Sequence, residues 1–137
     1  GKATLPWGTA VIATTTYSDS ENLENGDPLT QMPEWMASLF VNHTIRSGAL
    51  EGLGFGGGAR YTGRSYGFSI SEEEGFARIP DYALFDLFLR YRFENGVTAS
   101  VNARNIANKR YVATCTASSA CYYGQGRSVT ARLDFRW

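Results

Sequence analysis

The segment Arg127–Trp137 reads R-S-V-T-A-R-L-D-F-R-W and alternates between two kinds of side chain. One alternate set is apolar and consists of Val129, Ala131, Leu133, Phe135 and Trp137. The other set is polar or charged and consists of Ser128, Thr130, Arg132, Asp134 and Arg136. Because successive side chains of a β-strand point to opposite faces, the segment predicts a strand with one apolar and one charged face. A soluble sheet shows the same alternation, so the lengths of the other strands decide between water and a membrane.

The same alternation predicts six strands along the chain. They are expected at residues 9–17, 34–46, 52–64, 81–93, 97–104 and 127–137. In the fourth strand, Phe85, Leu87 and Leu89 fall on one face, whereas Asp86 and Arg90 fall on the other. Several of these segments exceed the roughly 9–11 residues that cross a bilayer at a tilt, whereas strands of soluble sheets most often have about five or six. The lengths favour a membrane β-barrel with lipid on its apolar face and a wet interior on the other.

The connections between these strands alternate in length. The polar segments at residues 18–31, 65–79 and 105–126 are long, whereas the connections at 47–51 and 94–96 are short. Outer-membrane barrels have short periplasmic turns and longer extracellular loops. We therefore expect the long segments outside the cell and both chain ends on the periplasmic side.

Composition argues against several other classes of protein. The 137 residues include 13 basic and 13 acidic side chains, so no basic surface indicates a nucleic-acid partner. No run of about 18 apolar residues is present, which excludes a membrane-spanning helix. No nucleophile, base and orienting group are gathered in the sequence, and we expect no enzyme. The first residues lack the apolar core of a signal peptide, so we expect the chain to start at a processed end or within a longer protein.

The two cysteines, Cys115 and Cys121, are separated only by small or polar residues. An even pair in a polar loop favours a disulfide formed in an oxidising compartment, and the alternative is two unrelated free thiols. A metal site needs more ligands than this pair supplies, and the single histidine, His43, is distant in sequence. The sequence therefore predicts no metal site.

Five segments, in their order along the chain, carry a resemblance to a known family. They are M-P-E-W-M-A-S-L (32–39), G-G-A-R-Y-T-G (57–63), I-P-D-Y-A-L-F-D (79–86), N-A-R-N-I-A-N-K-R-Y (102–111) and V-T-A-R-L-D-F-R-W (129–137). They resemble the C-terminal part of TonB-dependent outer-membrane siderophore receptors of the ferrichrome and ferrioxamine type. The departures are Ile106-Ala107-Asn108, where the family has Leu-Phe-Asp, and Trp137, where phenylalanine is commoner.

The resemblance implies an all-β fold, an antiparallel meander of about six long strands that forms the C-terminal portion of a transmembrane β-barrel. Family barrels have about 22 strands around an N-terminal plug, so we expect residues 1–137 to be the C-terminal segment, with the plug and earlier strands absent. Even the smallest barrels need about eight strands, so we expect this segment not to transport anything alone.

The function implied by the resemblance is energised uptake of ferric siderophores, favouring the hydroxamate type, across the bacterial outer membrane. The implied partners are the ferric siderophore, outer-membrane lipid and lipopolysaccharide, the remainder of the barrel and its plug, TonB through that plug, and the barrel assembly machinery. Iron arrives only inside the siderophore complex, so no cofactor is expected. Nucleic acid is not an expected partner.

The resemblance also assigns roles to individual residues. A Cys115–Cys121 disulfide would staple the last extracellular loop. The adjacent Tyr122 and Tyr123 are candidates for contact with the siderophore by stacking and phenol hydrogen bonds, and the alternative is a place in an interfacial aromatic girdle. Further candidates near the top of the third strand are Tyr66 and Phe68. The residues expected to form the C-terminal assembly signal are Val129, Leu133, Phe135 and Trp137.

Charged side chains on the polar faces of the strands are expected to line the barrel interior. They are Asp86, Arg90, Arg92, Arg104, Arg132, Asp134 and Arg136. They would pair with one another or with the plug, and a buried pair stabilises only when it is well matched. The alternative is a hydrated polar wall.

Two other functions fit an alternating β-rich chain. One is a small porin-like or adhesion barrel formed by association of several copies. The other is a soluble ligand-binding barrel of the lipocalin type, whose apolar face would point into a closed interior. The N-x-x-N…Tyr motif and the terminal-strand pattern favour the receptor over the first alternative, and partitioning between buffer and detergent distinguishes the second.

Overall fold

The computed structural model describes residues 1–19, 27, 29–71, 75–117 and 120–135. Within this part of the chain the regular structure is entirely β, with no helix long and apolar enough to cross a membrane. The strands are β1 (Lys2–Thr4), β2 (Thr9–Tyr17), β3 (Trp35–Thr44), β4 (Leu53–Thr62), β5 (Ser65–Ser71), β6 (Gly75–Ile79), β7 (Tyr82–Arg92), β8 (Thr98–Arg104), β9 (Val112–Ala117), β10 (Ala120–Tyr123) and β11 (Ser128–Asp134).

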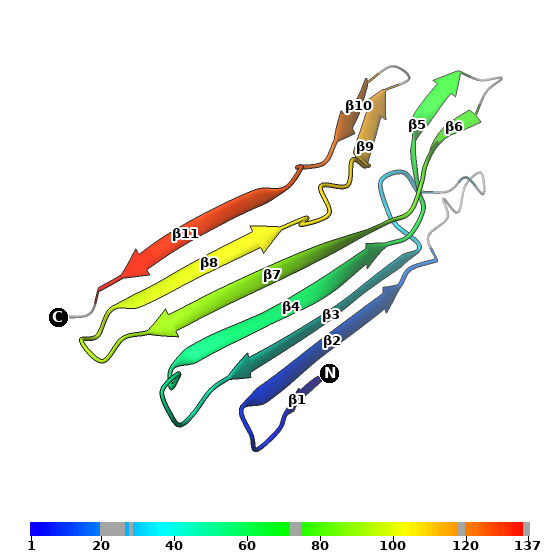
Figure 1. Cartoon of the computed structure of the whole chain (residues 1–137). Helices are drawn as coiled ribbons and strands as arrows, with labels where there is room; N and C mark the ends of the chain where they lie inside the picture. The colour runs from blue at the N-terminus through cyan, green and yellow to red at the C-terminus, as the bar shows by residue number, and fades with distance from the viewer. Residues whose placement is uncertain (20–26, 28, 72–74, 118–119, 136–137) are drawn as a thin grey trace.

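Seven strands form one antiparallel sheet in the order β1-β2-β3-β4-β7-β8-β11 (Figure 1). Neighbours in the sheet follow one another along the chain, apart from the two excursions that form the separate hairpins β5–β6 and β9–β10. The six predicted strands are all present as β2, β3, β4, β7, β8 and β11. The antiparallel meander is therefore confirmed, with the short β1 added at one edge.

The long polar segments at residues 65–79 and 105–126 each contain a β-hairpin that was not predicted. In the first, Tyr66 and Phe68 alternate with serine and glycine, so a strand signal was present between β4 and β7. In the second, β9 begins only at Val112, and residues 105–111 form an irregular turn after β8. The polar composition of these segments did not indicate strands, because loops and short exposed strands are both rich in polar residues.

The short connections lie together at one end of the sheet, and the two hairpins extend beyond the other end (Figure 1). Residues 5–8, 45–52 and 93–97 make the short turns, and glycines with φ between 83° and 91° occur in all three. Glycine reaches this left-handed region without steric cost, which permits tight reversals. The alternation of short and long connections is thus confirmed, and following the pattern of outer-membrane barrels we call the hairpin end extracellular and the other end periplasmic.

The register of the sheet gives it one apolar face and one polar face. A row of direct partners crosses the sheet on the apolar face: Val11, Val41, Gly57, Leu87, Ala103 and Val129. Large side chains of this face are exposed, among them Leu87 at 51% and Leu133 at 61%. Among the described residues the only buried hydrophobic side chains are Ile79, Leu84 and Cys115. A contiguous apolar surface of this kind is unsuited to water and fits contact with lipid.

Aromatic side chains mark both ends of the apolar face. At the extracellular end the rings of Tyr17 and Trp35 lie 5.2 Å apart between centroids. At the end with the short turns, Tyr91 and Phe93 make an edge-to-face contact at 4.7 Å. Tyrosine and tryptophan favour the boundary between hydrocarbon and water, so these pairs fit the expected interfacial girdles.

The polar face carries two phenylalanines that lie over glycines. Phe40 of β3 and Phe88 of β7 stack with centroids 5.8 Å apart and an interplanar angle of 19°. Between their strands, β4 presents Gly56 and Gly58 to the same face. A Cβ added to Gly58 would come within 2.8 Å of Phe40 Cε2 and 2.9 Å of the Leu39 carbonyl oxygen. Missing side chains on β4 therefore make room for the aromatic pair.

We predict that Gly58→Ala destabilises the sheet by about 1–3 kcal/mol through overpacking. The measurement is heat-modifiable electrophoretic mobility of the full-length receptor that contains this chain, with the unfolding temperature lowered in the variant. Gly54→Ala is the matched control on the same strand and face, because its added Cβ meets Thr44 Oγ1 at an ordinary 3.4 Å. Equal unfolding temperatures for the two variants would contradict the packing argument.

Candidate ligand-contacting hairpins and their anchor

Three of the motifs found in the sequence meet at one cluster at the extracellular end of the polar face. Arg60 of β4 binds Asp86 of β7 through two hydrogen bonds, Nε to Oδ2 at 2.8 Å and Nη2 to Oδ1 at 3.1 Å. The backbone N–H of Asn105, which follows β8, donates to Asp86 Oδ1 at 3.0 Å. The Asp86 side chain is only 15% exposed. A two-point guanidinium–carboxylate bond holds its partners in a defined orientation, so Asp86 joins β4, β7 and the end of β8.

Asn105 anchors both the entry and the exit of the β9–β10 hairpin. Its side-chain Nδ2 donates to the carbonyl oxygens of Lys109 at 2.9 Å and Gln125 at 3.1 Å. Its Oδ1 accepts from the Lys109 N–H at 2.9 Å. Asn105 is 2% exposed and has a φ of 50°, a conformation that asparagine tolerates better than most residues. A buried amide with its bonds satisfied on two sides fixes the base of the hairpin.

Two further contacts tie the same base together. Asn108 Oδ1 accepts from the Arg127 N–H at 3.0 Å, which joins the turn to the start of β11. The rings of Tyr82 and Tyr111 lie 4.2 Å apart, so the beginning of β7 packs against the segment that enters β9. The Gly124 N–H donates to the Tyr111 carbonyl oxygen at 2.9 Å. Asn105, Asn108 and Tyr111 together form what we call the hairpin anchor.

The predicted disulfide between Cys115 and Cys121 is present and links β9 to β10. The buried Cys115 faces Gly67 of β5, where an added Cβ would lie 2.7 Å from Cys115 Cβ. The two hairpins therefore pack side by side, β9 lying against β5 and β6 (Figure 1). The disulfide closes one hairpin, and its buried half supports the contact with the other.

The four predicted ligand-contacting residues lie on these adjoining hairpins. Tyr122 and Tyr123 are on β10, exposed at 57% and 75%, and Phe68 is on β5, exposed at 48%. Tyr66 on β5 is partly buried, and its carbonyl oxygen accepts from the Gln31 N–H at 2.6 Å. Tyr66 and Phe68 thus lie on a hairpin strand just beyond β4, beside the hairpin that carries the tyrosine pair. Contact with a ligand stays a prediction for all four residues.

The residues predicted to form an assembly signal are only partly described. Val129 and Leu133 lie on the apolar face of β11 and are exposed, as is Phe135 just beyond the strand. Arg136 and Trp137 lie outside the described residues. The assembly role stays a prediction.

The predicted interior charges other than Arg136, which lies outside the described residues, are on the polar face, and some of them pair. Besides the Arg60–Asp86 pair, Arg132 Nε donates to Asp134 Oδ1 at 2.8 Å within β11. Arg90, Arg92 and Arg104 have no ion-pair partner in the part of the chain that is described. Within the same residues, no group of three or more His, Cys, Asp or Glu side chains is arranged to hold a metal ion.

Sequence reasoning missed the anchoring role of Asn105 and the pairing of Arg60 with Asp86. All three residues stood in motifs that carried the family resemblance, but a motif does not state which of its members meet. The register Gly58–Asp86 brings Arg60 diagonally next to the carboxylate. That register depends on the full pairing of β4 with β7, which a list of strands does not supply.

Comparison with known proteins identifies the family. The family described as TonB dependent receptor-like, beta-barrel, matches residues 1–106.

The chain belongs to the TonB-dependent receptor family.

Two relatives show how this chain compares with whole TonB-dependent receptors. The ferrichrome outer membrane transporter/phage receptor of Escherichia coli (strain K12) is 32% identical over 99% of this chain and 19% of its own length. A ferrioxamine B receptor of Salmonella typhimurium is 33% identical over 87% of this chain and 17% of its own length. The chain thus spans less than a fifth of the length of these relatives.

A solved structure supports the same fold. The ferripyoverdine receptor of the outer membrane of Pseudomonas aeruginosa, bound to ferripyoverdine, superposes with a TM-score of 0.81 at 27% identity. The match covers 96% of this chain and 18% of the receptor. The sheet is therefore part of a receptor barrel in the bacterial outer membrane. Family membership favours the receptor over the porin-like, adhesion and lipocalin-like alternatives.

We predict that Asn105→Ala loosens the β9–β10 hairpin without unfolding the barrel. The substitution removes three hydrogen bonds and leaves buried backbone groups unpaired, at a cost of about 1–3 kcal/mol. The measurement is limited proteolysis of the intact full-length receptor in outer-membrane vesicles, with faster cleavage between residues 112 and 123. The control is Asn102→Ala, which replaces an exposed asparagine on the polar face of β8, the strand that precedes Asn105. If both variants are cleaved at the wild-type rate, Asn105 does not anchor the hairpin.

Proposed function

We propose that this chain forms part of the barrel wall and extracellular surface of a receptor that imports ferric siderophores across the outer membrane. The siderophore class we favour is the hydroxamate type, because relatives named for ferrichrome and ferrioxamine match most of the chain. The observation that most supports this proposal is the disulfide-closed β9–β10 hairpin. It exposes Tyr122 and Tyr123 and packs against the β5–β6 hairpin.

The chemistry of these hairpins suits recognition of a bulky chelate. Tyrosine offers a broad apolar ring and a phenol that donates or accepts a hydrogen bond, with only two side-chain torsions to immobilise. A hairpin closed by Cys115–Cys121 and held at Asn105 loses little further freedom when a ligand binds. The iron is cargo inside the siderophore, and the hairpins contact the organic shell of the complex.

The remaining partners follow from membership in a larger receptor. The polar face, with Arg90, Arg92 and Arg104, would face the barrel interior and its plug, and TonB would act on that plug to open the path. The apolar face would contact outer-membrane lipid and lipopolysaccharide. The terminal strand β11 would be read by the assembly machinery. The proposed activity is transport and includes no chemical reaction of the cargo.

The direct test replaces both exposed tyrosines of β10 in the full-length receptor. We expect Tyr122→Ala/Tyr123→Ala to weaken binding of ferrichrome or ferrioxamine B by about tenfold or more, since each aromatic contact contributes on the order of 1 kcal/mol. Binding is measured with radioactive iron in the chelate on purified receptor, and uptake is measured in cells under the same conditions.

The control is Tyr17→Ala, which removes an exposed tyrosine of the apolar face away from the hairpins. The Tyr17→Ala receptor should bind both chelates with the affinity of the wild-type receptor. Unchanged binding in the double variant would show that these tyrosines do not contact the siderophore. Binding of neither chelate by the wild-type receptor would instead contradict the proposed siderophore class.

A further inference from the structure

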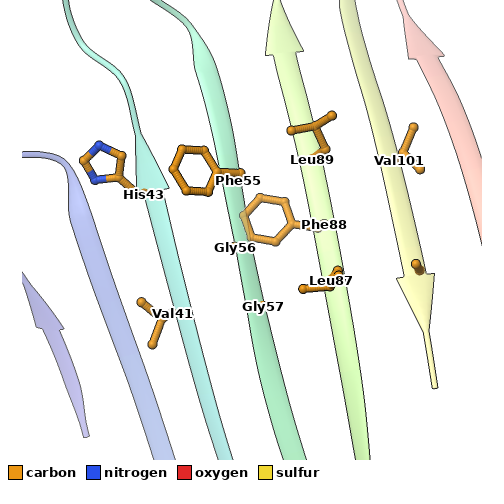
Figure 2. A pocket seen from close by; sticks show the side chains of 10 residues that line it. Val41, His43, Phe55, Gly56, Gly57, Leu87, Phe88, Leu89 and Val101 are labelled. Atoms are coloured by element: carbon orange, nitrogen blue, oxygen red, sulfur yellow. The ribbon is translucent and has the colours of Figure 1, made fainter. Parts of the chain in front are cut away.

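The apolar face contains a hollow of about 520 Å³ toward its periplasmic end (Figure 2). Gly57 of β4 lies at its base, between Val41 of β3 and Leu87 of β7. Ala103 of β8, the partner of Leu87 in the sheet, also lines the hollow. Because glycine has no side chain, Leu87 leans across Gly57, where an added Cβ would lie 2.8 Å from Leu87 Cδ2, and Ala103, with only a methyl group, leaves the other side of Leu87 open. The pairing register of the four strands β3, β4, β7 and β8 therefore determines where the hollow lies.

One end of the hollow carries a polar side chain. His43 points out of the apolar face beside Phe55, their ring centroids 5.6 Å apart (Figure 2). Thr9 Oγ1 lies 2.8 Å from His43 Nδ1. For the other ring nitrogen, Nε2, the described residues provide no hydrogen-bond partner. A polar group facing hydrocarbon is costly unless it is hydrogen-bonded, so a partner for Nε2 has to come from outside this part of the chain.

The position of His43 limits what that partner is. β3 ends one residue later at Thr44, and the short turn at 45–52 follows. The ring nitrogen Nε2 of His43 thus lies toward the periplasmic end of an apolar hollow, an arrangement that suits a phospholipid with its acyl tail along the sheet and its polar head group at the membrane boundary.

We propose that this hollow is a binding site for one glycerophospholipid of the periplasmic leaflet. One acyl chain lies over Gly57 and Ala103, and the glycerol ester or phosphate oxygen accepts a hydrogen bond from His43 Nε2. In this proposal the Thr9 hydroxyl donates to Nδ1 and the proton of the imidazole is on Nε2, the tautomer that a lipid acceptor selects. The hollow is continuous with the lipid-facing surface of the sheet, so an acyl chain reaches it from the bilayer without crossing any polar group.

The test is native mass spectrometry of the full-length receptor titrated with phosphatidylethanolamine in a mild detergent. We expect Ala103→Leu, which fills the hollow, and His43→Phe, which keeps the ring but removes its hydrogen bond, each to lower lipid occupancy about five-fold. That change corresponds to the loss of one net hydrogen bond or a comparable contact. The control is Ala13→Leu, which enlarges a side chain of the same apolar face on β2, outside the hollow.

Three results would overturn the proposal. Equal occupancy in wild type, both variants and the control would show only non-specific annular lipid. Loss with Ala103→Leu but not with His43→Phe would show that the hollow takes a hydrocarbon chain without recognising a phospholipid. Saturation of the same site by lipid A in preference to phosphatidylethanolamine would assign the hollow to lipopolysaccharide. Retained unfolding temperatures in all variants, read from heat-modifiable mobility, exclude a loss of binding through misfolding.

Discussion

A strand that crosses hydrocarbon has to pair every backbone N–H and C=O with another strand, because lipid offers no hydrogen-bond partner. In this chain β3, β4, β7 and β8 each have a hydrogen-bonded neighbour on both sides, and β2 is paired with β3 along its length but with β1 only at residues 10–12. At one edge the pairing continues through β1, and Gly1 exchanges backbone bonds with Ala13. Once the ladders are complete, each side chain is committed to one face, and a shift of one residue would reverse all of them.

The connections at the two ends of the sheet are stabilised in different ways. At the periplasmic end, reversals of a few residues need only glycine at positive φ, as at Gly8 and Gly96. At the extracellular end, long excursions have to be held above the membrane without an apolar core to pack on. The structure uses polar bonds instead: Arg60 and Asp86 join two strands, and Asn105 closes the base of the hairpin that follows. The disulfide then stiffens the hairpin at its far end. The proposed recognition at this surface would therefore depend on polar bonds within the barrel wall.

Period-two alternation was enough to predict the long strands, because burial in lipid on one side imposes it over many residues. The segment 9–17 was placed with the bounds that β2 has, and the fourth segment extended only slightly beyond β7. The hairpins were not predicted, since their strands are short and lie within segments rich in polar and small residues. Within β5, the alternation of Tyr66 and Phe68 with small residues carried the signal. The candidate tyrosines came from family resemblance, whereas the Asp86–Asn105 contact required the register.

The account depends most directly on which face of the sheet meets lipid. Nitroxide labels placed one at a time at Ser100, Val101, Asn102 and Ala103 of β8 in the full-length receptor, reconstituted in vesicles, measure this position by position. The structure predicts alternation: labels at 101 and 103 are more accessible to oxygen dissolved in the bilayer, and labels at 100 and 102 are more accessible to a water-soluble nickel complex. The opposite phase, or accessibility that does not alternate, would contradict a membrane sheet with this register.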